Sequence, residues 1–146
     1  MFADFFKRLS GHTPETLPDA DARLALTSLL VRVARSDGHY ADEERRLITR
    51  IVEERYHLAA DEAAQLRAEG EAAEAEAPDT VRFTRAIKEA VPYEERRAVI
   101  EALWRVVLAD GRREHDEDAL LRLVANLLGV SDMDSALARQ RVKAEG

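Results

Sequence analysis

Apolar residues recur at spacings of three and four along most of the chain, whereas the strict alternation typical of a half-buried strand is hard to find. That spacing places apolar side chains along one face of a helix, so it predicts amphipathic helices. The expected helices cover about residues 3–9, 22–36, 42–56, 80–91, 93–109 and 132–144, with a further one ending near residue 128. We therefore predict an all-α fold, a compact bundle of seven or eight helices that forms a single domain over residues 1–146.

The segment between about residues 60 and 79 lacks large apolar side chains and is rich in alanine and glutamate. The segment contains one basic residue, Arg67, and many acidic ones: Asp61, Glu62, Glu69, Glu71, Glu74, Glu76 and Asp79. Alanine and glutamate favour a helix, but such a helix can bury little apolar surface. We interpret the segment as a solvated helix or helical connector with Gly70 as a candidate break, and the alternative is an acidic docking surface.

Two parts of the chain match each other without a gap when residues 24–57 are placed on residues 97–130. The identical residues cluster around an Asp-Gly pair: Ala25 and Ala98, Leu30 and Leu103, Arg32 and Arg105, Val33 and Val106, Asp37-Gly38 and Asp110-Gly111, Glu44 and Glu117, and Leu47 and Leu120. Such self-similarity is typical of a duplicated supersecondary unit. We predict two helix–Asp-Gly–helix units, at about 20–57 and 93–130, related by an approximate twofold axis, with helices 22–36 and 93–109 packed together.

The Asp-Gly turns have a simple structural explanation. Glycine closes the last turn of a helix because it readily adopts the left-handed conformation. Glu44 and Glu117 each follow the aspartate by seven residues, which places them in the first turn of the next helix. A carboxylate there binds free backbone N–H groups and interacts favourably with the helix dipole. In this interpretation both glutamates are caps, and no metal is needed.

The doubled pattern resembles the TerB-like domain of tellurite-resistance proteins. The pattern runs from Ala34 to Glu44 in the first unit and from Leu108 to Glu117 in the second, and the resemblance covers about residues 20–130. It implies a compact helical domain that acts as a non-catalytic partner in stress response or in membrane-associated complexes. It also implies acidic loop residues that are suspected of binding a divalent cation.

If the twofold relation holds, the two turns lie together at one end of the bundle and their carboxylates form a candidate metal site. The primary candidates are Asp37, Glu44, Asp110 and Glu117, and the secondary candidates are Glu43, Glu114, Asp116, His39 and His115. Oxygen ligands without thiolates favour calcium, magnesium or manganese, and a histidine would shift the preference toward manganese or zinc. Nearby arginines, Arg35, Arg45 and Arg46 among them, could instead neutralise the carboxylates as ordinary ion pairs.

The composition narrows the function classes. The chain has no cysteine and a net charge of −7, which excludes thiolate chemistry and argues against nucleic acid, whose binding requires basic surface. We find no apolar window long enough to span a membrane and expect a cytoplasmic protein without a signal peptide or transmembrane segment. No catalytic motif or nucleophile–base pair is visible. We expect a non-catalytic interaction module with a protein partner, whose turns bind a divalent cation; the alternatives are a structural adaptor without metal and a metal-dependent enzyme.

The N-terminal helix carries an apolar stripe formed by Phe2, Phe5, Phe6 and Leu9. A helix this short is marginal on its own, so we expect the stripe to pack against the bundle. The alternatives are a protein partner and a lipid surface, the latter allowing peripheral membrane association. Trp104 lies on an apolar helical face, and we expect it in the core.

Overall fold

A computed structural model of the protein describes residues 2–9, 19–36, 38, 40–77, 80–109 and 115–145, except for the side chains of residues 3, 8, 9, 19 and 115–118. This described part contains eight helices and no strand, which confirms the all-α prediction. The helices are α1 (Ala3–Leu9), α2 (Asp19–Arg35), α3 (Asp42–Tyr56), α4 (Ala60–Glu76), α5 (Val81–Ala90), α6 (Tyr93–Leu108), α7 (His115–Leu127) and α8 (Asp132–Glu145).

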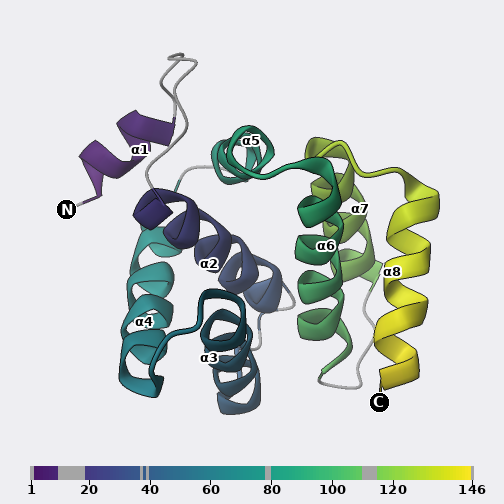
Figure 1. Ribbon diagram of the computed structural model, residues 1–146, viewed down its shortest axis with the longest axis horizontal. Helices are drawn as coiled ribbons and strands as arrows, with labels where there is room; N and C mark the ends of the chain where they lie inside the picture. Colours follow the sequence, from purple (N-terminus) through teal and green to yellow (C-terminus); the bar gives the residue numbers. More distant parts are fainter. Residues whose placement is uncertain are drawn as a thin grey trace.

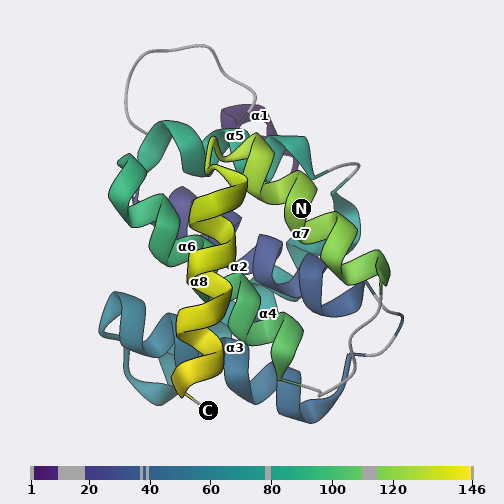
Figure 2. The ribbon, with the colours of Figure 1, turned by 90° about the vertical axis from the view of Figure 1, so that its right-hand side faces the viewer.

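Six of the helices form two groups of three, as Figure 1 shows. Helices α2, α3 and α4 lie on one side of the molecule, α6, α7 and α8 lie on the other, and α5 contacts both groups. Across the boundary α2 packs against α6, as predicted, while α3 contacts α6 and α2 contacts α7. Helix α8 covers the outer side of the second group, where it packs on α6 and α7 (Figure 2).

The helix boundaries follow the sequence repeat. In the gap-free alignment of the two units, the end of α2 at Arg35 falls on the end of α6 at Leu108. The start of α3 at Asp42 falls on the start of α7 at His115, and the start of α4 at Ala60 falls one residue after the start of α8. The helix boundaries are therefore consistent with the predicted repeat, and the two units and their twofold axis stay predictions.

The core lies where the apolar faces of the two groups meet. Leu29 and Leu30 of α2 are fully buried, as are Ile100 and Leu103 of α6, and Phe83 of α5 completes the cluster. Burying one such side chain stabilises the fold by about 1.5–3 kcal/mol. The faces that join the two groups therefore contribute much of the folding free energy.

The acidic segment forms a helix, α4, as expected, but this helix packs into the bundle along one face and is not a fully solvated connector. Helix α4 packs against both α2 and α3, and Ala63, Gly70 and Ala73 are buried along it. Gly70 does not interrupt the helix. A Cβ atom at this position would lie 2.6 Å from Thr27 Cγ2 and 3.3 Å from the Ser28 backbone nitrogen. Small residues thus let α4 approach α2 closely, since the side chains at a contact set the distance between two helices.

The aromatic residues of α1 and Trp104 of α6 pack as predicted. In α1, Phe5 is buried and the Phe6 ring lies 6.4 Å from the Phe83 ring of α5, centre to centre, so α1 packs against the bundle. Trp104 is buried in α6, and its indole N–H donates to the Ser135 hydroxyl of α8 at 3.2 Å. This hydrogen bond helps to hold α8 on α6. No helix in the described part of the chain is both long and apolar enough to cross a membrane.

Candidate functional site

Glu44, a primary candidate for the metal site, caps the helix in which it lies. Ala41 precedes α3 in an extended conformation and offers no side-chain cap. Its backbone N–H donates to Glu44 Oε1 at 3.3 Å, and Glu44 is only 3% exposed. Gly38 has a φ of +81°, the left-handed conformation expected of the glycine in this turn. These contacts support the capping explanation of Glu44.

The other predicted site residues fall into three groups. Glu43 is exposed on α3, one residue before Glu44. Four turn residues lie outside the described part of the chain: Asp37, His39, Asp110 and Glu114. Three residues begin α7 with side chains that are not described: His115, Asp116 and Glu117. The described side chains include no group of three potential metal ligands, so the convergence of the two turns stays a prediction.

The arginines beside the first turn pair with carboxylates of α4. Arg35 Nη1 lies 2.7 Å from Glu74 Oε1, and Arg45 Nε lies 3.6 Å from Glu71 Oε2. Tyr40 lies between these arginines, each guanidinium 5.0 Å from the centre of its ring. Burial, together with the Glu71 carboxylate, raises the pKa of Tyr40 well above its usual range, so the phenol stays protonated. The acidic helix thus neutralises two arginines that the sequence offered as counter-ions for the turns.

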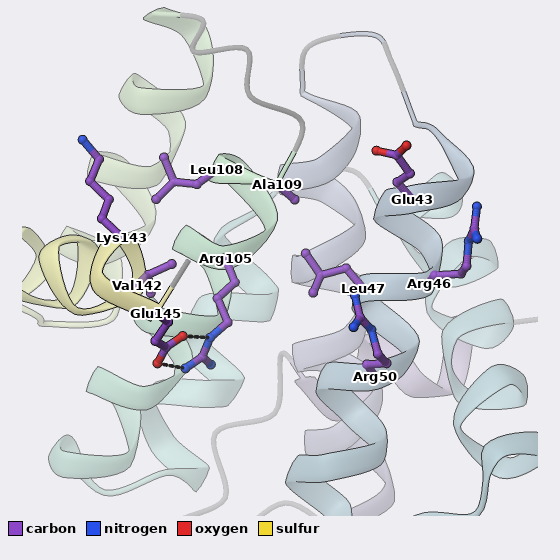
Figure 3. A pocket seen from close by; sticks show the side chains of 10 residues that line it. All are labelled: Glu43, Arg46, Leu47, Arg50, Arg105, Leu108, Ala109, Val142, Lys143 and Glu145. Atoms are coloured by element: carbon purple, nitrogen blue, oxygen red, sulfur yellow. Dashed lines mark hydrogen bonds and ion pairs between the residues drawn. The ribbon is translucent and has the colours of Figure 1, made fainter.

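A groove of about 870 Å³ lies between the two helix groups. Figure 3 shows α3 on one side of it and α6 and α8 on the other. Its apolar lining consists of Leu47 from α3 and of Leu108, Ala109 and Val142 from the opposite wall. The groove therefore offers an apolar strip to a ligand at the boundary of the two units.

Charged side chains surround this strip: the cations Arg46, Arg50, Arg105 and Lys143 and the carboxylates Glu43 and Glu145. Arg105 Nε and Nη2 donate to the two oxygens of Glu145 at 3.1 and 3.0 Å. These hydrogen bonds raise the pKa of Arg105 and lower the pKa of Glu145, so both groups are charged near neutral pH. Arg50 and Lys143 form no ion pair with a carboxylate of the described residues. The groove therefore carries an excess of positive charge.

A smaller hollow of about 330 Å³ continues the groove along α3 and α6. The two hollows share Leu47, Arg50 and Arg105 in their linings. The smaller hollow adds Ala98 and Ala102 of α6, Ile51 of α3, and the charged residues Glu54, Arg55 and Glu101. Together the hollows form an extended surface along the boundary between the two units.

The sequence did not predict this groove, although α3 contains a signal for it. Arg46 and Arg50 stand one helical turn apart, and Leu47, three residues before Arg50, neighbours Arg50 on the helix surface. The pattern places positive charges beside an apolar residue at the edge of the core stripe. What the sequence could not provide is the opposite wall, because it comes from α6 and α8.

A family model described as Tellurite resistance protein TerB matches residues 23–140. The chain belongs to the TerB family. The match begins in α2 and ends in α8. Val142, Lys143 and Glu145 follow the matched range, which means that the family model does not cover the α8 wall of the groove. Comparisons with curated proteins and with solved structures returned no significant match.

Proposed function

We propose that this TerB domain is a non-catalytic interaction module that binds a protein partner in the groove between α3, α6 and α8. The observation that carries the proposal is the combination of an apolar strip with surrounding cations in an open groove. Binding sites on proteins combine an apolar centre with a polar rim in this way. A role in stress response or in membrane-associated complexes, in the cytoplasm, is part of the proposal and rests on the family.

The chemistry of the groove favours binding over catalysis. A general acid or base works best when its pKa lies near the working pH. The pKa of Glu145 is lowered and that of Arg105 is raised, each mainly by their mutual hydrogen bonds, so both pKa values move away from neutrality. Arginine also cannot release a proton under ordinary conditions. These groups are suited to holding a charged ligand in place.

Cation binding by the acidic turns stays a second proposal, drawn from the sequence and the family. Its ligands would be carboxylates of Asp37, Asp110 and Glu117, with calcium, magnesium or manganese as the ion. Glu44 fits a cap better than a ligand, because its carboxylate is buried and accepts the Ala41 N–H. A divalent ion at the turns would fix the ends of α2 and α6 relative to each other and thereby stabilise the bundle.

Selection from a displayed library of random peptides tests the proposed docking surface on the purified protein. We expect enriched peptides that lose binding to Arg46→Glu/Lys143→Glu, in which both walls of the groove change charge. Arg85→Glu/Arg122→Glu is the matched control, because both arginines are exposed and neither lines the groove. The proposal is wrong if no peptide is enriched, or if the enriched peptides bind both double variants equally well.

A further inference from the structure

We propose that the groove takes an acidic amphipathic helix of the partner, one of whose carboxylates replaces Glu145 on Arg105. The inference rests on the proposed function and specifies the chemistry of the partner. It is carried by three observations: the shape and apolar strip of the groove, the spacing of its cations, and the exposed ion pair at its wall.

The dimensions and the apolar strip fit one face of a helix. The lining of the groove along α3 runs from Glu43 to Arg50, which at about 1.5 Å per residue corresponds to about two turns of a helix. Leu47 on one wall and Leu108 and Val142 on the other meet the apolar stripe of such a helix. Grooves that bind an amphipathic helix contact its apolar residues, which recur every three or four positions, about once per turn.

The cations on both walls favour a partner helix that has acidic residues on both sides of its apolar stripe. Arg46 and Arg50 stand one turn apart on α3, and Lys143 and Arg105 occupy the opposite wall. A partner helix with glutamates one turn apart beside its apolar stripe meets these cations on both sides. Two other anionic surfaces fit less well. Among the described residues that line the two hollows none is aromatic, so they offer no ring on which a nucleobase could stack, and a concave groove does not present its cations to a flat bilayer.

The ion pair between Arg105 and Glu145 shows that this wall of the groove can bind a carboxylate. The corresponding arginine of the first unit, Arg32, donates to the Glu74 carboxylate, to the carbonyl oxygens of Glu74 and Ala77, and to the Thr80 hydroxyl. Its side chain is 17% exposed. Arg105 has Glu145 alone as its hydrogen-bond partner among the described residues, and the two side chains are 37% and 55% exposed. A carboxylate of a partner can therefore displace Glu145 at little cost, since exposed ion pairs contribute little.

The test uses fluorescence anisotropy with a synthetic peptide of about 15 residues that carries a leucine stripe flanked by glutamates. The comparison peptides have every glutamate replaced by glutamine or by lysine. We expect the acidic peptide to bind about tenfold more tightly than the glutamine peptide. Arg50→Ala/Lys143→Ala should weaken its binding by about tenfold, and Arg85→Ala/Arg122→Ala should not. Glu145→Gln should tighten binding by about threefold, because it releases Arg105.

Several results would overturn the inference. These are equal binding of the glutamine or lysine peptide, acidic binding that ignores Arg50→Ala/Lys143→Ala, weaker binding by Glu145→Gln, and equally tight binding of a single-stranded RNA or of vesicles rich in phosphatidylserine. If the alanine double variant does not melt cooperatively, Arg50→Gln/Lys143→Gln takes its place. Library peptides that use the groove but lack acidic residues would refute this inference and leave the proposed function intact. A library that yields no groove ligand would refute the proposed function.

Discussion

Replacing Gly70 by alanine should destabilise the protein, even though alanine is the better helix former. Gly70 lies inside α4, where alanine would be favoured by about 1 kcal/mol if the position were solvated. In the structure the added methyl group would lie 2.6 Å from Thr27 Cγ2 and 3.1 Å from Thr27 Cβ. Thr27 does not turn away freely, because its hydroxyl donates to the Arg23 carbonyl oxygen of α2 at 2.7 Å.

The expected size of the effect follows from two opposing contributions. Forcing a methyl group into a well-packed contact costs about 1–3 kcal/mol, and the gain in helix propensity offsets about 1 kcal/mol of this. We therefore expect Gly70→Ala to lower the free energy of unfolding by about 1 kcal/mol, or the melting temperature by roughly 2–4 °C. Thr27→Ser removes the clashing methyl group and keeps the hydroxyl. The double variant should therefore recover most of the loss.

Urea unfolding followed by circular dichroism measures these free energies in a double-mutant cycle. Ala72→Gly is the matched control, because Ala72 is exposed on the same helix and reports helix propensity alone, a loss of about 1 kcal/mol. A Gly70→Ala variant that is more stable than the wild type would refute the reasoning. So would an effect of Gly70→Ala that is unchanged in the Thr27→Ser background, because α4 would then not be in close contact with α2.

Three further predictions concern the turns and the groove. Glu44→Ala should lower the free energy of unfolding by about 0.5–2 kcal/mol through loss of the cap, while Glu43→Ala at the exposed neighbour changes it by less than about 0.5 kcal/mol; equal effects in urea unfolding would contradict this. If a divalent ion binds the turns, it should stabilise the wild type by roughly 2.7 kcal/mol at a concentration of about a hundred times its Kd, and Asp37→Asn/Asp110→Asn should lose this gain in thermal melts. The pKa of Glu145 should titrate below the usual range of a glutamate in carboxyl NMR, with the ion pair complete above that range and lost as the pH falls through the lowered pKa; replacing its arginine partner by glutamine should return the pKa to normal.

Most of the fold was predictable because large apolar residues mark the helix faces that pack together. The match of Leu30 with Leu103 and of Val33 with Val106 identified the two helices that meet at the core. The role of α4 was not predictable in this way. It packs through alanines and Gly70, whose contribution depends on how closely two backbones approach, and the sequence does not state which helix lies opposite.

The candidate site was predictable only where its interactions are local in sequence. The capping of Ala41 by Glu44 spans three residues and follows from the position of Glu44 in the first helical turn. The ion pair between Arg105 and Glu145 joins residues 40 positions apart, and it forms because α8 packs on α6. Leu47 of α3 and Val142 of α8 line opposite walls of the groove and are distant in sequence, so no local pattern could reveal it.

An acidic chain can hold an acidic partner because its charges are unevenly distributed. Much of the negative charge lies on α4, at the edge of the molecule opposite α8 (Figure 1). Glu71 and Glu74 of this helix are already paired with arginines of α2, α3 and α4. Salt at physiological concentration screens charges beyond about 8 Å, so a ligand in the groove responds mainly to the charges that line it: the cations Arg46, Arg50, Arg105 and Lys143 and the carboxylates Glu43 and Glu145. The net charge of −7 therefore slows the approach of an acidic helix more than it weakens the bound complex, and selectivity rests on the contacts made inside the groove.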